Sequence, residues 1–301
     1  MNAYSKIGLL IFNLLFISCS NTEETTEIEL KDIPVFVTEL NPVDDNNVIQ
    51  GIASFENGWF VTQKSGTSLL LINYLDNNGV SLYHKRFSLN SHGQDLSLEH
   101  VSENQLHLFT TKGSFDGNRN TGILKFSITL PDKVNNERDW TQLNITVENE
   151  YNLNYIHATP TLDEEKQQFA IRSNNTILIH NKELIDANDF TSSNHFQLND
   201  SQLIDNGNFS MWYQGIAMKN NLVYCLTGND KLATHKKIYV YSQNGIVTKK
   251  FTFDKDDLGQ NFLDKFEPEG LTFKNNELYF TIMTKNNINI GNIKYLYKIA
   301  I

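Results

Sequence analysis

Five polar side chains recur at related positions along the chain, each beside a short apolar run. They are Gln50, Glu99, His157, Gln214 and Glu269. Carboxylate, amide and imidazole groups that meet in one cavity can hydrogen-bond sugar hydroxyls, a cation or ordered water. Glu99 and Glu269 are the favoured pair, because a buried carboxylate is costly unless it has a partner. We therefore predict a ligand-binding ring, with a purely structural role in binding water and neighbouring backbone as the alternative.

Several aromatic, imidazole and thiol side chains near these positions are predicted either to contact a ligand or to be structural. Trp212 and Tyr213 lie beside one of the five positions and can stack on sugar rings. Trp59 stands in an apolar strand pattern and is predicted to be core. His92 is expected to order a loop and His100 to pack. Cys225 lies in the apolar run LVYCLTG, which predicts a buried, inert thiol.

An enzymatic site is the less favoured reading of the same residues. Glu99, His157 and Glu269 could hold a divalent ion, and oxygen ligands suit calcium, as in lactonase-like propellers. The sequence shows no H-E-x-x-H, no G-x-S-x-G and no glycine-rich phosphate loop. We expect no cofactor other than Ca²⁺ at Glu99 and Glu269, and we expect binding rather than catalysis.

The elements that must position these side chains are short β-strands. After residue 33 the chain consists of alternating or apolar runs rich in Val, Ile, Phe, Tyr and Thr, separated by Asn-Asn and Asn-Gly turns. Gln50-Gly51, Gln214-Gly215 and Glu269-Gly270 open three similar hairpins, with Ile52, Ile216 and Leu271 in one column. Trp59, Val223 and Leu278 form a second column.

Degenerate copies of this phrase at Glu99 and His157 bring the units to five, spaced by about fifty residues. Such a repeat predicts an all-β, five-bladed β-propeller. The last unit has only three strands of its own, and residues 35–40 (VFVTEL) are predicted to supply the fourth and close the ring. One propeller spanning 33–301 is therefore favoured over two β-sandwiches.

The N-terminus has the pattern of a bacterial lipoprotein signal. Lys6 precedes an apolar stretch from Ile7 to Ile17, and Cys19 follows a small residue, as in a lipobox. We predict a signal peptide over 1–19, lipidation of Cys19 and a flexible acidic tether over 20–32. These features predict a lipid-anchored envelope protein at the outer membrane or cell surface. An ordinary signal peptide is the alternative.

The net charge of the chain limits the kinds of partner that it is expected to bind. The chain has 35 acidic and 25 basic residues, a formal net charge of −10. Nucleic-acid binding requires a basic footprint and is therefore not expected. We expect a monomer.

Several motifs in order resemble the TagC-like five-bladed propeller family, which includes helveticin J-type bacteriocins and phage receptor-binding propellers. The motifs are WFVTQ, SHGQDLSLEH, YQGIAMKNNLVYCLTGN, IYVYSQNG and FEPEGLTF, within residues 48–301. The resemblance implies a propeller that binds a glycan or an envelope polymer, or a secreted bacteriocin-like effector. A surface scaffold for protein interactions is the remaining alternative.

Overall fold

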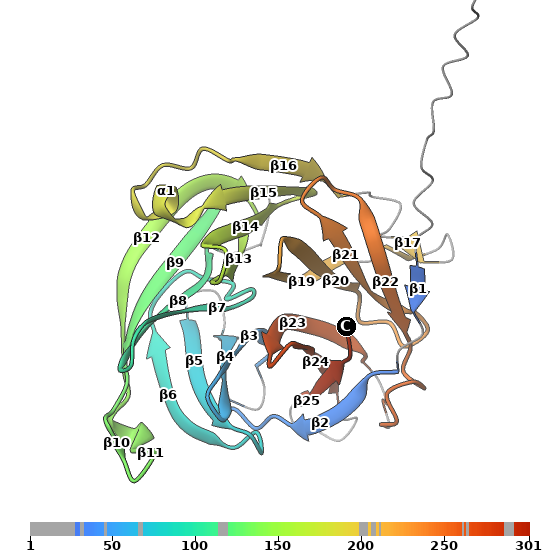
Figure 1. The fold of residues 1–301 in the computed structure, drawn as a ribbon. Coiled ribbons are helices and arrows are strands. Elements are labelled where there is room, and N and C mark those ends of the chain that lie inside the picture. The colour runs from blue at the N-terminus through green and yellow to red at the C-terminus, as the bar shows by residue number, and fades with distance from the viewer. Residues whose placement is uncertain are drawn as a thin grey trace, which may run out of the picture.

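Alternating apolar residues and asparagine turns build five antiparallel sheets around a common axis in the computed structural model (Figure 1). The structure describes residues 28–30, 33–44, 47–65, 69–113, 120–198, 204–205, 209–210, 212–260, 262, 265–285 and 292–301. The hairpin turns Asn220-Asn221 and Asn275-Asn276 have positive φ angles of 52°, 64°, 50° and 65°. Asparagine tolerates this conformation, so the turn chemistry of the sequence sets the hairpins.

Each blade has four strands, written here from the axis outward. Blade 1 is β3 (Ile49–Phe55), β4 (Gly58–Ser65), β5 (Leu69–Asp76) and β6 (Ser81–Phe87). Blade 2 is β7 (Ser97–Ser102), β8 (Gln105–Lys112), β9 (Asn120–Thr129) and β12 (Asn144–Ile156). Blade 3 is β13 (Thr159–Asp163), β14 (Gln168–Ser173), β15 (Thr176–Asn181) and β16 (Asn194–Gln197).

The remaining two blades follow the same pattern. Blade 4 is β19 (Trp212–Lys219), β20 (Leu222–Gly228), β21 (Lys236–Ser242) and β22 (Val247–Phe253). Blade 5 is β23 (Glu267–Lys274), β24 (Glu277–Lys285), β25 (Asn292–Ile299) and β2 (Val35–Glu39). Small additions are β10 (Lys133–Val134), β11 (Glu137–Arg138), β17 (Ile204–Asp205), β18 (Phe209–Ser210), the 3₁₀ turn Trp140–Gln142 and the short helix α1 (Lys182–Asp186). The prediction of an all-β, five-bladed propeller is confirmed.

The N-terminal strand closes the ring, as the sequence predicted. β2 pairs antiparallel with β25, with Val35 opposite Lys298 and Glu39 opposite Tyr295. The C-terminal blade thus receives its outer strand from the other end of the chain. This pairing covers the edge of β25, which would otherwise offer unpaired backbone groups.

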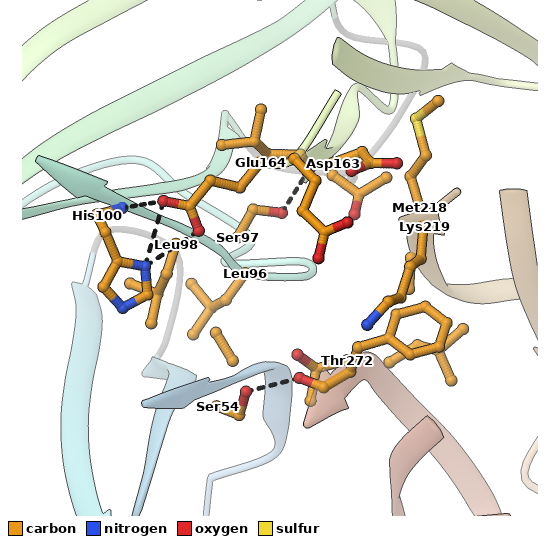
Figure 2. A pocket seen from close by; sticks show the side chains of 17 residues that line it. Ser54, Leu96, Ser97, Leu98, His100, Asp163, Glu164, Met218, Lys219 and Thr272 are labelled. Carbon is orange, nitrogen blue, oxygen red and sulfur yellow. Dashed lines mark hydrogen bonds and ion pairs between the residues drawn. The ribbon is translucent and has the colours of Figure 1, made fainter. Parts of the chain in front are cut away.

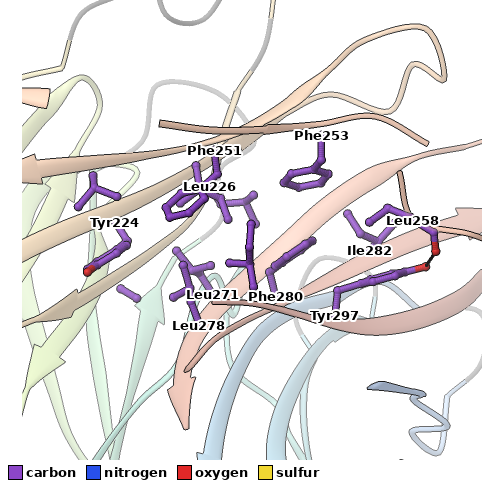
Figure 3. Packing of buried hydrophobic residues seen from close by; sticks show 14 of the residues in the cluster. Tyr224, Leu226, Phe251, Phe253, Leu258, Leu271, Leu278, Phe280, Ile282 and Tyr297 are labelled. Atoms are coloured by element: carbon purple, nitrogen blue, oxygen red, sulfur yellow. Dashed lines mark hydrogen bonds between the residues drawn. The ribbon is translucent and has the colours of Figure 1, made fainter. Parts of the chain in front are cut away.

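Five apolar clusters lie between adjacent blades, one at each interface. The cluster between blades 4 and 5 includes Phe251, Phe253, Phe280 and Tyr297, whose rings lie close together in Figure 3. Trp59 is buried between blades 5 and 1, which confirms its assignment to the core. Each blade therefore contributes one face to each of two interfaces.

Cys225 lies in the cluster between blades 3 and 4. It is buried, and burial raises the pKa of its thiol to about 12. A thiol in this state is a poor nucleophile, which agrees with the prediction of an inert core residue.

The predicted signal peptide, Cys19 and residues 20–27 of the predicted tether lie outside the described residues. Ile28–Leu30, also in that tether, forms β1, which pairs in parallel with β22 at the outer edge of blade 4. No helix among the described residues is long and apolar enough to cross a membrane.

Candidate functional site: the axial cavity at the start of the inner strands

The five inner strands run in the same direction along the axis, so the molecule has two different mouths. We call the mouth where these strands begin the start-side mouth and the opposite one the end-side mouth. A cavity of about 580 Å³ opens at the start-side mouth. Gln50, His157, Gln214 and Glu269 all line it, so the structure brings four of the five predicted ring residues together.

Glu99 is not in this cavity, and the alignment that placed it in the ring is wrong. Its carboxylate is paired with Lys182 (Oε1 to Nζ, 2.8 Å) and His107 (Oε2 to Nδ1, 2.9 Å). The fifth place is taken by Gln94, which lines the cavity. The signal was present in the sequence, because Gln94-Asp95-Leu96 repeats the pattern of Gln50-Gly51-Ile52.

Bulges in the inner strands lie at or beside three of the ring residues. The ladder between β3 and β4 shifts register between Ile49 and Gly51, and so leaves Gln50 as the extra residue. The same shift occurs at Gln214 in β19 and beside Glu269 in β23. A bulge turns a side chain out of the normal alternation of the strand. In blades 1 and 4 the extra residue is the ring residue itself, whereas in blade 5 it is Gly270, directly after Glu269.

The residue after each ring position lets the inner strands meet and close the axis. A Cβ on Gly51 would lie 2.6 Å from the carbonyl carbon of Asp95, and one on Gly270 would lie 3.0 Å from the nitrogen of Ile52. Blade 2 has Asp95 at this place. Its Oδ2 accepts a hydrogen bond from Ile216 N (2.6 Å) and its Oδ1 accepts one from Leu271 N (3.4 Å). Asp95 thus joins blade 2 to blades 4 and 5 below the cavity floor.

Glu269 is the most perturbed acid of the ring. Burial raises its pKa well above the usual value, and the neighbouring carboxylate of Glu267 raises it further. Lys265 and a hydrogen bond with Gln94 oppose this shift. Its Oε2 has no hydrogen-bond partner in the protein, and neither has the buried Oε1 of Gln50.

Glu267 lines the same cavity but is held by protein groups. It forms an ion pair with Lys265 and accepts a hydrogen bond from Gln214 Nε2 (3.3 Å). Gln94 Nε2 in turn donates to the backbone oxygen of Gln214. The amides of Gln94 and Gln214 are therefore oriented by contacts with other blades.

Arg172 is a cavity residue that the sequence reasoning missed. In the second strand of blade 3 it pairs with Thr159, at a place where blades 1 and 5 have Thr62 and Thr281. It is buried, and its Nη2 donates to Thr159 Oγ1 (3.0 Å). A charged residue inside the apolar run FAIRS was the available signal.

The two aromatic candidates have different positions. Trp212 is 55% exposed at the cavity, as a stacking surface must be. Tyr213 is buried, and the guanidinium carbon of Arg172 lies 5.9 Å from the centre of its ring. His92 also lines the cavity. Of these two aromatic side chains, Trp212 is therefore the one whose ring is accessible for stacking on a sugar.

Residues 45–288 match the family model of the phage five-bladed β-propeller receptor-binding platform domain. The protein belongs to this family. Helveticin J-type proteins and TagC, named in the sequence resemblance, remain a prediction. No curated protein matches the chain.

Two solved structures have the same fold as this chain. The tail fibre of Staphylococcus aureus phage P68 superposes with a TM-score of 0.66 at 19% identity, covering 89% of this chain and 53% of that one. A GH43 glycoside hydrolase, engineered to show endo-xylanase and exo-arabinofuranosidase activity, gives a TM-score of 0.54 at 9% identity, covering 85% and 51%. The chain thus spans about half the length of each of these two proteins.

The two residues expected as possible calcium ligands, Glu99 and Glu269, do not meet at the axial cavity. Glu269 lies at the axial cavity, whereas Glu99 is in ion pairs with His107 and Lys182. Within the described part of the chain, no group of three or more His, Cys, Asp or Glu side chains is arranged to hold a metal ion. Glu99 and Glu269 therefore do not line one cavity, and calcium binding by this protein stays a prediction.

Proposed function

We propose that this receptor-binding propeller binds a glycan of the cell envelope in the start-side cavity, as a lipoprotein anchored through Cys19. Membership of a family described as a receptor-binding platform supports binding as its role. The cavity supports a sugar as the ligand.

The observation that carries this proposal is the pair of buried oxygens without protein partners, Gln50 Oε1 and Glu269 Oε2. Both residues line a cavity of about 580 Å³ that Gln94 and Gln214 also line. Burying a polar atom without a hydrogen bond is costly. A ligand that donates hydrogen bonds to these two oxygens would remove that cost. Sugar hydroxyls donate and accept at several closely spaced points, as this set of amides and carboxyl groups requires.

Trp212 supports the same ligand class. Its indole is exposed beside the polar ring, and the apolar face of a sugar can stack on such a surface while the hydroxyls reach the cavity. Arg172 adds a fixed positive charge that would favour an acidic sugar or a phosphate-bearing polymer.

Binding is tested with purified envelope polysaccharide in a pull-down or by calorimetry. Glu269→Ala and Trp212→Ala should each weaken binding about tenfold, because each removes a contact worth about 1 kcal/mol or more. Glu99→Ala is the matched control, since Glu99 lies outside the cavity. Equal binding by wild type and Glu269→Ala would refute the site.

The same samples discriminate the alternatives. Release of reducing sugar from the bound polysaccharide would support a hydrolase, and killing of neighbouring bacteria would support a bacteriocin-like effector. Binding of protein with no binding of polysaccharide would support an interaction scaffold. Membrane association that is lost in Cys19→Ala would support the lipid anchor.

A further inference from the structure

A second pocket lies at the end-side mouth, about 210 Å³ in volume, where the five inner strands finish. Its walls include Ser54 from β3, Ser97 from β7, Met218 from β19 and Thr272 from β23 (Figure 2). The inner strands packed around Asp95 separate it from the start-side cavity. It is therefore a separate compartment, and its chemistry can be judged by itself.

One polar atom in this pocket lacks a partner. Asp163, the last residue of β13, is only 4% exposed, and its Oδ2 has no hydrogen-bond partner. Its other oxygen, Oδ1, accepts a hydrogen bond from Lys166 N (3.2 Å) in the following turn. The side chain is thus fixed by its turn at the wall of the pocket, and its second oxygen is buried there without a donor.

The remaining charges leave the pocket acidic. Glu164 accepts from both the backbone nitrogen (2.6 Å) and Nδ1 of His100 (3.0 Å). The hydrogen bond with Glu164 raises the pKa of His100, and the protonated imidazole offsets the charge of Glu164. Lys219, on the opposite wall in Figure 2, donates to Asn276 Oδ1 (2.6 Å) and lies over the ring of Phe273. Asp163 and the exposed Glu165 then face a single lysine, which leaves one negative charge in excess.

We propose that the end-side pocket binds a small primary amine, whose ammonium group donates to Asp163 Oδ2. An ammonium group carries three donors and a positive charge, and so supplies both a hydrogen bond and the missing countercharge. The hydroxyls of Thr161 and Thr272 offer further acceptors, and Leu98 and Met218 provide an apolar wall for a short carbon chain. The volume limits the ligand to a small molecule or a single terminal group. This site does not depend on the glycan site at the other mouth.

A titration of the full chain with ethanolamine, followed by amide NMR, tests this proposal. The Lys166 amide, which donates to Asp163, should shift and saturate in the millimolar range or below, together with its neighbours. N-acetylethanolamine, which has no charge, should bind at least tenfold more weakly, because a hydrogen bond to a charged group is the stronger kind.

Asp163→Asn should weaken ethanolamine binding about tenfold or more while keeping the turn, since asparagine Oδ1 can still accept from Lys166 N. Glu103→Gln, an exposed acid in the turn between β7 and β8, is the matched control and should bind normally. Glu269→Ala should also bind ethanolamine normally, because it alters only the other mouth.

Three results would overturn the amine site: no saturable shift with ethanolamine, equal binding of its N-acetyl derivative, or wild-type affinity in Asp163→Asn. The melting temperature of Asp163→Asn distinguishes lost binding from lost folding. If that variant melts below the wild type by more than a few degrees, Lys219→Met provides a second test. Removal of the like charge should then tighten ethanolamine binding, and unchanged or weaker binding would contradict the proposal.

Discussion

At the scale of single residues, two buried acids on the axis differ in what they bind. Asp95 has its oxygens occupied by the backbone of Ile216 and Leu271, whereas Glu269 keeps one oxygen without a protein partner. Burial raises the pKa of both carboxyls well above their usual values. Asp95 therefore has the contacts of a structural residue, and Glu269 has those of a ligand-binding one.

The raised pKa of Glu269 predicts that folding stability depends on pH. The folded protein holds this proton at pH values where the unfolded chain, with an ordinary pKa of 4.5, has lost it. The free energy of unfolding should therefore fall as pH rises from about 4.5 toward the folded pKa. Glu269→Gln removes this contribution, and Asp95 keeps its own.

Urea unfolding of wild type and Glu269→Gln at pH 5 and pH 8 measures the effect. Relative to the wild type, the variant should have a higher free energy of unfolding at pH 8 than it has at pH 5. A difference that is the same at both pH values would mean that Glu269 titrates in the folded protein as it does in the unfolded chain.

At the scale of elements, the site depends on how each inner strand begins. A bulge lies at the ring residue in blades 1 and 4 and directly after it in blade 5, and the next residue is glycine in all three. The absence of a side chain there allows the strands to pack against one another. The cavity floor and the orientation of the ring are thus two results of one local arrangement.

Gly51→Ala should destabilise the propeller, because the new methyl group would stand 2.6 Å from the backbone of Asp95. We expect a loss of about 1–3 kcal/mol, the usual range for overpacking a core. Gly259→Ala is the control, since its Cβ would meet nothing within 4 Å and only its φ of +65° is unfavourable. Gly259→Ala should lower the free energy of unfolding by about 1 kcal/mol. Denaturant unfolding compares the two, and an equal cost would count against the close-packed axis.

At the scale of the whole molecule, the ring is held by its closure. β2 supplies the outer strand of blade 5, and Leu40 just after it is buried in the cluster between blades 5 and 1. The two ends of the chain thus meet in one sheet. Because this sheet joins strands that are far apart in sequence, losing the pairing of β2 with β25 should destabilise the whole propeller.

Deletion of residues 1–40 should lower the melting temperature by more than about 10 °C or cause aggregation, because it exposes the edge of β25 and removes Leu40 from its cluster. Deletion of residues 1–27, which leaves β1 and β2 in place, is the control and should melt within a few degrees of the full chain. Calorimetry or circular dichroism checks both. A shorter chain that melts like the control would show that blade 5 is stable with three strands.

The sequence by itself determined the strands, the turns and the five-fold repeat, because alternation and asparagine turns are local properties of the chain. It also predicted the closing strand at 35–40 and the core positions of Trp59 and Cys225. It placed four of the ring residues at the cavity, since each stands at or near the beginning of the inner strand of its blade.

Only the tertiary structure decided the remainder. Gln94 rather than Glu99 reaches the axis because the chain approaches the centre before the ladder of β7 begins at Ser97. Arg172 enters the cavity from a second strand, and Asp163 keeps an unpartnered oxygen at the other mouth. These facts depend on how separate blades pack against one another, and such long-range contacts leave no periodic trace in the sequence.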